Sequence, residues 1–122
     1  TIAVRFAGVD IETGYDNAFN DIADSNSTWA TDYISTAVAN GWINGYSDGT
    51  FRPDQEITRA ESVTIINRIM GRVYDAEYIE ENDVNIFSDV TTSHWGYGDI
   101  LEASVDHTYE EDEDGEIWVS VD

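Results

Sequence analysis

Apolar side chains recur at helical spacing along residues 29–40 of this chain. They occupy positions i, i+4, i+5, i+8 and i+9 of the segment, and they are Trp29, Tyr33, Ile34, Ala37 and Val38. A stripe with this period is typical of a helix that buries one face. The Asn40-Gly41 pair predicts the end of the helix, because glycine suits the left-handed position that follows a last turn.

A second helix is expected to begin at Thr58. The sequence Thr58-Arg59-Ala60-Glu61 has the spacing of a capping box, in which the side chains of the first and last residues bond each other's amides. We expect this helix to run to Met70 and to end at Gly71. The side chains expected on its buried side are Val63, Ile66 and Met70.

Turns and acidic segments separate the expected helices. Residues 42–53 are rich in Gly, Asp and Asn and predict an ordered, turn-rich loop. Residues 72–86 are acidic and show no clear period, which indicates a connection, and residues 94–106 repeat the pattern of the first helix. In residues 107–122, Asp114-Gly115 lies between two apolar-containing runs and predicts a hairpin turn.

Two pairs of similar segments indicate an internal repeat. Phe19-Asn20-Asp21-Ile22 followed by Trp29-Ala30 returns as Phe87-Ser88-Asp89-Val90 followed by Trp95-Gly96, and residues 1–8 resemble residues 64–71. The shared order of the two pairs predicts one repeating unit. Residues 1–18 would then end a preceding unit, residues 19–71 would form a whole one, and residues 72–122 would form a connection and a divergent last one.

The charge is strongly negative. The 122 residues include 26 Asp and Glu but 5 basic residues, all of them Arg, and the net charge is −21. Such a field disfavours nucleic acid and anionic membrane surfaces as partners. Absence of Cys excludes disulfides and thiolate metal sites, and no run of apolar residues reaches the length of a membrane span.

The repeating unit resembles one complete S-layer homology motif over residues 19–71. The residues that carry the resemblance are Phe19-x-Asp21, Trp29-Ala30, Ile34-x-x-Ala37, Gly41-Trp42-Ile43-x-Gly45-Tyr46-x-Asp48-Gly49-Thr50-Phe51-x-Pro53 and Ile57-Thr58-Arg59-Ala60-Glu61. Residues 1–8 resemble the end of a previous motif, and residues 87–106 resemble the start of a following one. The last unit departs from the pattern, because it lacks both the Gly-Tyr loop and the Thr-Arg-Ala-Glu box.

The resemblance implies a fold and a function. The fold would be one mostly α module, a pseudo-threefold helical bundle with long ordered loops and a small C-terminal β-hairpin. The function would be non-catalytic anchoring at the bacterial cell surface or S-layer, through an anionic and often pyruvylated secondary cell-wall polysaccharide. The divergent last unit leaves an alternative open, a structural or assembly domain of a surface-layer protein that binds no glycan.

Arg59 is the first candidate for ligand binding, because the resemblance gives the Arg of the box this role. At the first position of a helix, its guanidinium and the free amides of the first turn can receive a carboxylate together. A salt bridge to one of the many acids, or a fully solvated side chain, is the alternative. No serine-hydrolase, phosphate-loop or zinc-protease motif occurs, so we expect no enzyme and no cofactor.

Seven further residues complete the candidate site: Asp21, Asp89, Gly45, Tyr46, Asp48, Trp29 and Trp95. The two aspartates could cap loop amides or bond sugar hydroxyls, and capping is favoured. The tryptophans, with Trp42, are expected in the core, with stacking on a sugar as the alternative. Gly45 meets a backbone requirement and could let a ligand approach, while Tyr46 and Asp48 shape the groove or close the turn.

No metal site is expected. Neither His94 nor His107 has a second His or Cys at the spacing of metal ligands. The segment from Glu110 to Gly115 resembles the front of a calcium loop, but Val121 stands where a bidentate Glu is needed, which favours a solvated acidic turn. Because the first unit is incomplete, we also expect an upstream segment or another copy of the chain to cover it.

Overall fold

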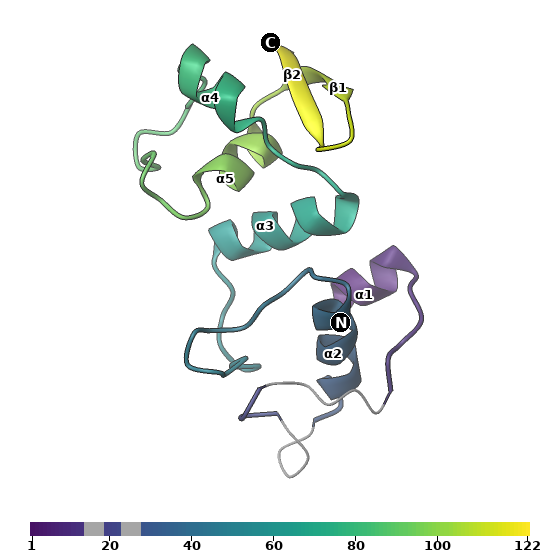
Figure 1. The fold of residues 1–122 in the computed structure, drawn as a ribbon. Coiled ribbons are helices and arrows are strands. Elements are labelled where there is room, and N and C mark those ends of the chain that lie inside the picture. Colours follow the sequence, from purple (N-terminus) through teal and green to yellow (C-terminus); the bar gives the residue numbers. More distant parts are fainter. Residues whose placement is uncertain (14–18, 23–27) are drawn as a thin grey trace. The chain divides into compact units, whose positions relative to one another are not determined.

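The structure is a computed structural model that describes residues 1–13, 19–22 and 28–122; the end of the predicted first unit, residues 14–18, lies outside them. Two compact units, Thr1–Glu56 and Ile57–Asp122, make up the chain. The described residues form five helices and one two-stranded sheet (Figure 1). The mostly helical class and the terminal hairpin are confirmed, and the pseudo-threefold arrangement stays a prediction.

The first unit holds α1 (Ile2–Ala7) and α2 (Thr31–Ala39). The Arg5 guanidinium lies over the Tyr33 ring, 5.3 Å from its centroid, and connects the two helices. Burial of large apolar side chains against α2 provides the core, since each contributes about 1.5–3 kcal/mol. These side chains are Phe19, Ile22 and Ile34.

In the second unit, α3 (Arg59–Met70) has well-defined ends, both as predicted. Thr58 Oγ1 accepts from the Glu61 amide at 3.2 Å, and the Glu61 carboxylate accepts from the Thr58 amide at 2.8 Å. At the other end, Gly71 has a φ of 70°. The first turn and the left-handed exit are therefore fixed by local sequence.

The buried side of α3 differs from the prediction. Ile66 and Met70 are 51% and 58% exposed, whereas Thr64 and Asn67 are buried. Both polar side chains bond Asp99 on α5 (Tyr97–Ser104): the Thr64 hydroxyl at 3.2 Å, and the Asn67 amide at 3.0 and 3.1 Å. Because the buried side chains of Thr64 and Asn67 are both hydrogen-bonded, a polar face can dock where apolar residues were expected.

The predicted connection at residues 72–86 contains a helix, so that prediction is wrong. Asp75 caps α4 (Ala76–Asn82) by accepting from the Tyr78 amide at 2.9 Å. Ile79 is buried in the core of this unit, while the acidic side chains of α4 face solvent. The other buried members of this core are Val84, Leu101, Val105 and Trp118.

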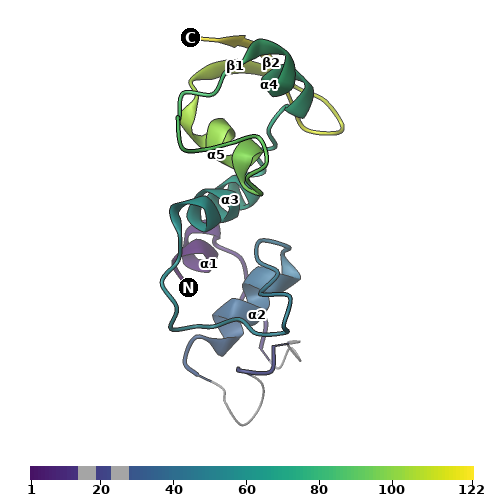
Figure 2. The same cartoon turned by 90° about the vertical axis from the view of Figure 1, so that its left-hand side faces the viewer.

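The C-terminal hairpin pairs β1 (His107–Glu111) with β2 (Glu116–Val121) in antiparallel fashion, as predicted. Asp112 closes the turn, since its carboxylate accepts from the amides of Asp114 and Gly115. In both views α4 lies beside the hairpin (Figure 1, Figure 2). The rings of Tyr78 and Trp118 join these elements at a centroid distance of 5.9 Å.

The apolar residues of α1 are partly uncovered. Ile2 and Phe6, four residues apart, are 85% and 77% exposed, while Val4 is buried. Coverage of this face by an upstream segment or another copy stays a prediction. Among the helices of the described residues, none is long and apolar enough to cross a membrane.

Candidate functional site

Asp21 holds the turn-rich loop of the first unit. Its two carboxylate oxygens accept from the amides of Phe51 at 2.9 Å and of Arg52 at 2.7 Å. Desolvation alone would raise the pKa of Asp21, but these amide bonds outweigh it, and the pKa lies below its ordinary value. The capping role expected for Asp21 is therefore what the geometry shows.

Asp48 and Tyr46 close the same loop around Arg52. The Asp48 carboxylate accepts from the Thr50 hydroxyl at 2.6 Å and pairs with the Arg52 guanidinium at 3.0 Å. The Thr50 hydroxyl and then the Arg52 guanidinium lower the pKa of Asp48 to about 2. The guanidinium also lies over the Tyr46 ring, 4.0 Å from its centroid.

Arg52 was not among the predicted site residues. Its backbone is left-handed, with a φ of 60°, which is uncommon for a residue other than Gly or Asn. The bond from its amide to Asp21 and the ion pair to Asp48 hold it in that conformation. In the sequence this residue stands between Phe51 and Pro53 with no local sign of its conformation.

Gly45 meets a backbone requirement, as expected, and a packing one. Its φ is 71°, and a Cβ at this position would overlap the Phe19 ring. Since Phe19 is part of the core of this unit, the loop comes directly onto that core at Gly45. A side chain here would have to displace the ring.

Arg59 lies at the first position of α3 and is exposed. Across the residues that the structure describes, its guanidinium has no hydrogen bond or ion pair. The expected alternative of a salt bridge to an acid is thus not found. The free amides of the first turn of α3 lie at the same end of the helix, where partial positive charge favours anions.

Trp95 lies close to this helix start. A Cβ built at the next residue, Gly96, would lie 3.5 Å from the Cβ of Ala60, so the backbone at Gly96 packs on the first turn of α3. The two flanking side chains, Trp95 and Arg59, are both exposed, Trp95 by 64%. The His94 ring stacks on Trp95 at 5.7 Å and its Nδ1 accepts from the Gly96 amide at 3.1 Å.

The expectation that the tryptophans are core residues is wrong for two of the three. Trp42 is buried, but Trp29 is 79% exposed and Trp95 is 64% exposed. Trp29, and the face of Trp95 opposite the His94 ring, are therefore available to a ligand. The helical spacing of apolar residues led to the wrong expectation for Trp29, because this residue precedes the first helical residue of α2, Thr31.

Asp89, the repeat counterpart of Asp21, does not cap a loop. It is exposed, and its carboxylate has no partner among residues 1–13, 19–22 and 28–122. In this segment the Asn85 side chain does the bonding, to the Val90 carbonyl at 2.7 Å and the Phe87 amide at 2.9 Å. Because the last unit lacks the Gly-Tyr loop, the amides that Asp21 binds have no equivalent for Asp89.

Comparison with known proteins adds a family match. Residues 18–61 match the family model described as "S-layer homology domain". The cellulosome-anchoring protein of Acetivibrio thermocellus is 40% identical over 110 residues, which are 89% of this chain and 22% of that protein. Cell surface glycoprotein 1 of the same organism is 36% identical over 97 residues, 76% of this chain and 4% of its own length.

An enzyme is also among the relatives. The amylopullulanase of Thermoanaerobacterium thermosulfurigenes is 34% identical over 90 residues, 74% of this chain and 4% of the enzyme. The chain thus spans about a fifth of the first of these relatives and far less of the other two. No solved structure matches the chain.

Proposed function

Since this chain carries an S-layer homology domain at residues 18–61, we propose that it anchors a larger protein to the bacterial cell wall without catalysis of its own. The resemblance drawn from the sequence is confirmed by the family match and by relatives named as anchoring and cell-surface proteins. The location is the bacterial cell surface. A similar segment makes up 4% of an amylopullulanase, which fits a module that accompanies enzymes rather than one that performs their chemistry.

The ligand we propose is an anionic secondary cell-wall polysaccharide, bound through a carboxylate at Arg59. The supporting observation is the guanidinium of Arg59 at the start of α3, which has no hydrogen bond or ion pair among the described residues. Within the described part of the chain the other four arginines each have a partner. A cation left unpaired in a chain with 26 acidic residues favours a role toward a ligand.

A carboxylated sugar suits this position better than a densely charged polymer. The net charge of −21 repels a polyanion as a whole, so binding has to rely on short-range contacts with few charges. A single pyruvyl carboxylate on a sugar could take a bidentate bond from Arg59 and bonds from the free amides of the first turn. The exposed Trp95 beside the same turn offers a face on which a sugar ring can stack.

The predicted site residues of the first unit shape the loop of that unit. The carboxylates of Asp21 and Asp48 hold the loop backbone and Arg52, which supports a role for both in shaping the loop. Gly45 and Tyr46 fix its path over the core. Within this unit, the exposed Trp29 offers a stacking face of its own.

Retention of the chain on purified wall polysaccharide tests the proposal. Arg59→Ala should reduce retention at least tenfold, and Arg59→Lys should recover part of it, because Lys keeps the charge but loses the bidentate geometry. Arg5→Ala removes the same charge elsewhere and should leave retention unchanged. Enzymatic removal of pyruvyl groups from the polymer should abolish the difference between wild type and Arg59→Ala. Equal retention of wild type and Arg59→Ala would remove Arg59 from the mechanism.

A second candidate is a structural role in lattice assembly without glycan binding. The exposed Ile2 and Phe6 on α1 favour it, because an uncovered apolar pair on one helix face is suited to contact with another protein surface. Light scattering with and without wall polymer distinguishes the two. Self-association of the chain together with no retention on polymer would favour assembly over anchoring.

A further inference from the structure

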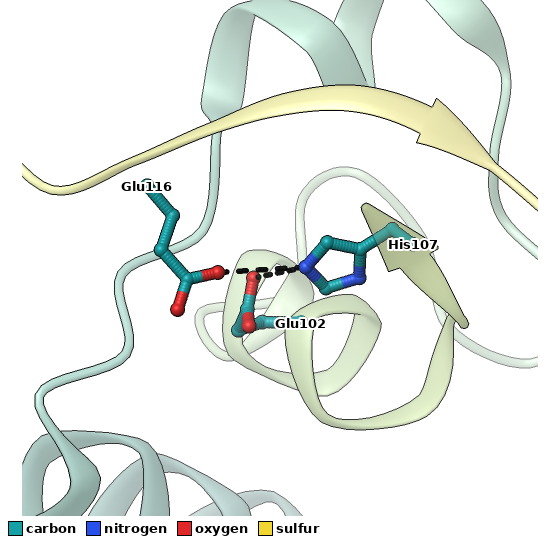
Figure 3. A group of neighbouring side chains, drawn as sticks. All are labelled: Glu102, His107 and Glu116. Carbon is teal, nitrogen blue, oxygen red and sulfur yellow. Dashed lines mark hydrogen bonds and ion pairs between the residues drawn. The ribbon is translucent and has the colours of Figure 1, made fainter. Parts of the chain in front are cut away.

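Three side chains of the second unit meet at one buried point. Glu102 comes from α5, His107 from the start of β1 and Glu116 from the start of β2 (Figure 3). His107 Nε2 lies 3.5 Å from one oxygen of each carboxylate, and all three ligand-type atoms lie within 4.8 Å of one another. The side chains are 0%, 1% and 4% exposed, so water screens their charges little.

The groups around this cluster fix its orientation. The Arg72 guanidinium pairs with the other oxygen of each carboxylate, at 2.6 Å for Glu102 and 3.6 Å for Glu116. His107 Nδ1 lies 2.7 Å from the Val105 carbonyl, and the ring stacks on Trp118 at a centroid distance of 3.7 Å. Arg72 therefore turns one oxygen of each Glu toward the imidazole, and the Val105 carbonyl requires the proton of the ring to be on Nδ1.

In this arrangement no positive charge lies between His107 Nε2 and the two carboxylate oxygens. When Nδ1–H donates to the Val105 carbonyl, Nε2 is the ring atom that faces the two carboxylate oxygens. Two ionised carboxylates in this buried place would exceed the single charge of Arg72, which is costly, and burial raises the pKa of Glu102. A positive species at Nε2, either a proton or a metal ion, removes both problems.

The distances favour a metal ion over a proton. A charge-assisted N–H···O bond is ordinarily about 2.7–2.9 Å long, and both N···O distances here are 3.5 Å. Ligand atoms about 2.0–2.1 Å from a tetrahedral zinc ion lie about 3.3–3.4 Å apart. The spacing of His107 Nε2 from the two oxygens thus resembles two edges of a coordination tetrahedron more than a pair of hydrogen bonds.

We propose that Glu102, His107 and Glu116 bind one divalent transition-metal ion of the zinc class. The imidazole and two carboxylate oxygens are ligands that zinc accepts, whereas Ca²⁺ prefers six to eight oxygens. The bond from Nδ1 to a backbone carbonyl is the outer contact that metal-binding histidines ordinarily make. Trp118 Nε1, which donates to Glu102 Oε2 at 3.0 Å, adds a second outer contact.

Two of the three proposed ligand residues, Glu102 and His107, border a cavity. The cavity has a volume of about 270 Å³ and is lined by Arg72 and residues 102–107. It is large enough for a hydrated ion to approach and for water to complete a fourth ligand position. Since the three ligands come from α5 and both strands, the bound ion would join the hairpin to the helical part of this unit.

Calorimetric titration of the chelator-treated chain with Zn²⁺, in the presence of excess Mg²⁺, tests this proposal. The Mg²⁺ occupies the acidic surface, so that a specific site appears as one equivalent of Zn²⁺ per chain. His107→Gln and Glu116→Gln should weaken this binding more than about 100-fold, the upper end of the effect of losing an outer contact. The controls His94→Gln and Glu111→Gln change the same residue types outside the cluster and should bind as wild type does.

A second measurement covers variants that do not fold. Addition of Zn²⁺ to the wild-type chain should raise its Tm by several degrees and Mg²⁺ should not, because an ion that binds only the folded state stabilises it. Bound Co²⁺ should show the visible absorption of a tetrahedral site. No Zn²⁺-dependent rise in Tm, or equal Zn²⁺ binding by wild type and His107→Gln, would overturn the proposal. Neither assay involves wall polymer, so the result is independent of the proposed glycan site.

Discussion

Removal of the Asp21 carboxylate tests the structural account of the glycine-rich loop most directly. Asp21→Ala leaves two loop amides, those of Phe51 and Arg52, without their acceptor. It also removes a bond that holds Arg52 at a φ of 60°. We therefore expect the loop to lose its conformation and the first unit to lose stability.

The size of the effect follows from the exposure of the two amides. A hydrogen bond to a charged group contributes about 1.5–3 kcal/mol where water cannot replace it, which applies to the part-buried Phe51 amide. The Arg52 amide is exposed, so water can substitute and its bond counts for about 1 kcal/mol or less. Asp21→Ala should thus cost about 2–4 kcal/mol of unfolding free energy, and Asp21→Asn about half as much.

Urea denaturation followed by circular dichroism measures this loss, and the repeat supplies a matched control. Asp89 occupies the corresponding place in the last unit but is exposed and has no partner in the described residues. Asp89→Ala should therefore change the unfolding free energy by no more than about 0.5 kcal/mol. If Asp21→Ala proves no more destabilising than Asp89→Ala, the amide bonds do not hold the loop and the reasoning fails.

Three further predictions concern the loop and α3. Gly45→Ala should destabilise the chain by about 2–4 kcal/mol, since a Cβ there overlaps the buried Phe19 ring; thermal unfolding measures it. Thr58→Ala should cost about 1 kcal/mol by removing the cap of the Glu61 amide. The pKa of Asp48 is about 2 in the folded state and near 4 in the unfolded state. Asp48 therefore contributes its full stabilisation above pH 4 and loses it as the pH falls through 2.

Each of these has its own control. Gly71→Ala probes a left-handed glycine with open space at its Cβ, so it separates backbone strain from the clash at Gly45. Thr58→Ser keeps the hydroxyl and should retain most of the stability, and a loss equal to that of Thr58→Ala would contradict the capping argument. Asp48→Asn should flatten the acid limb of the pH–stability curve; an unchanged limb would show that other carboxyls cause it.

Local sequence was enough to predict the ends of α3. The capping box at Thr58 and the left-handed Gly71 each depend on residues within four positions of one another. The hairpin turn at Asp114-Gly115 was predicted for the same reason. Both partners of such a short-range interaction lie within a few residues of each other in the sequence, so it can be predicted without knowledge of the rest of the fold.

The buried face of α3 could not be predicted in this way. Thr64 and Asn67 are buried because Asp99, more than 30 residues away, bonds both. An apolar pattern gives no indication of a polar interface whose partner lies on another element. The same limit applies to α4. This short acidic helix has one buried residue, Ile79, so its sequence shows no apolar period.

The buried cluster of Glu102, His107 and Glu116 has a similar cause. The sequence has no metal-ligand spacing at these residues, because the α5–β1 connection and the pairing of β1 with β2 bring them together. Arg59 is the opposite case. Its place at the helix start followed from the capping box, and its exposure leaves the predicted role in ligand binding open to test.

The four tryptophans fall into two complementary pairs, one in each unit. The first unit has exposed Trp29 and buried Trp42, and the second has exposed Trp95 and buried Trp118. A buried indole emits at shorter wavelength and is shielded from soluble quenchers, whereas an exposed one is not. Variants that keep a single tryptophan, with Phe at the other three positions, would therefore report by fluorescence on packing and on surface contact separately for each half of the chain.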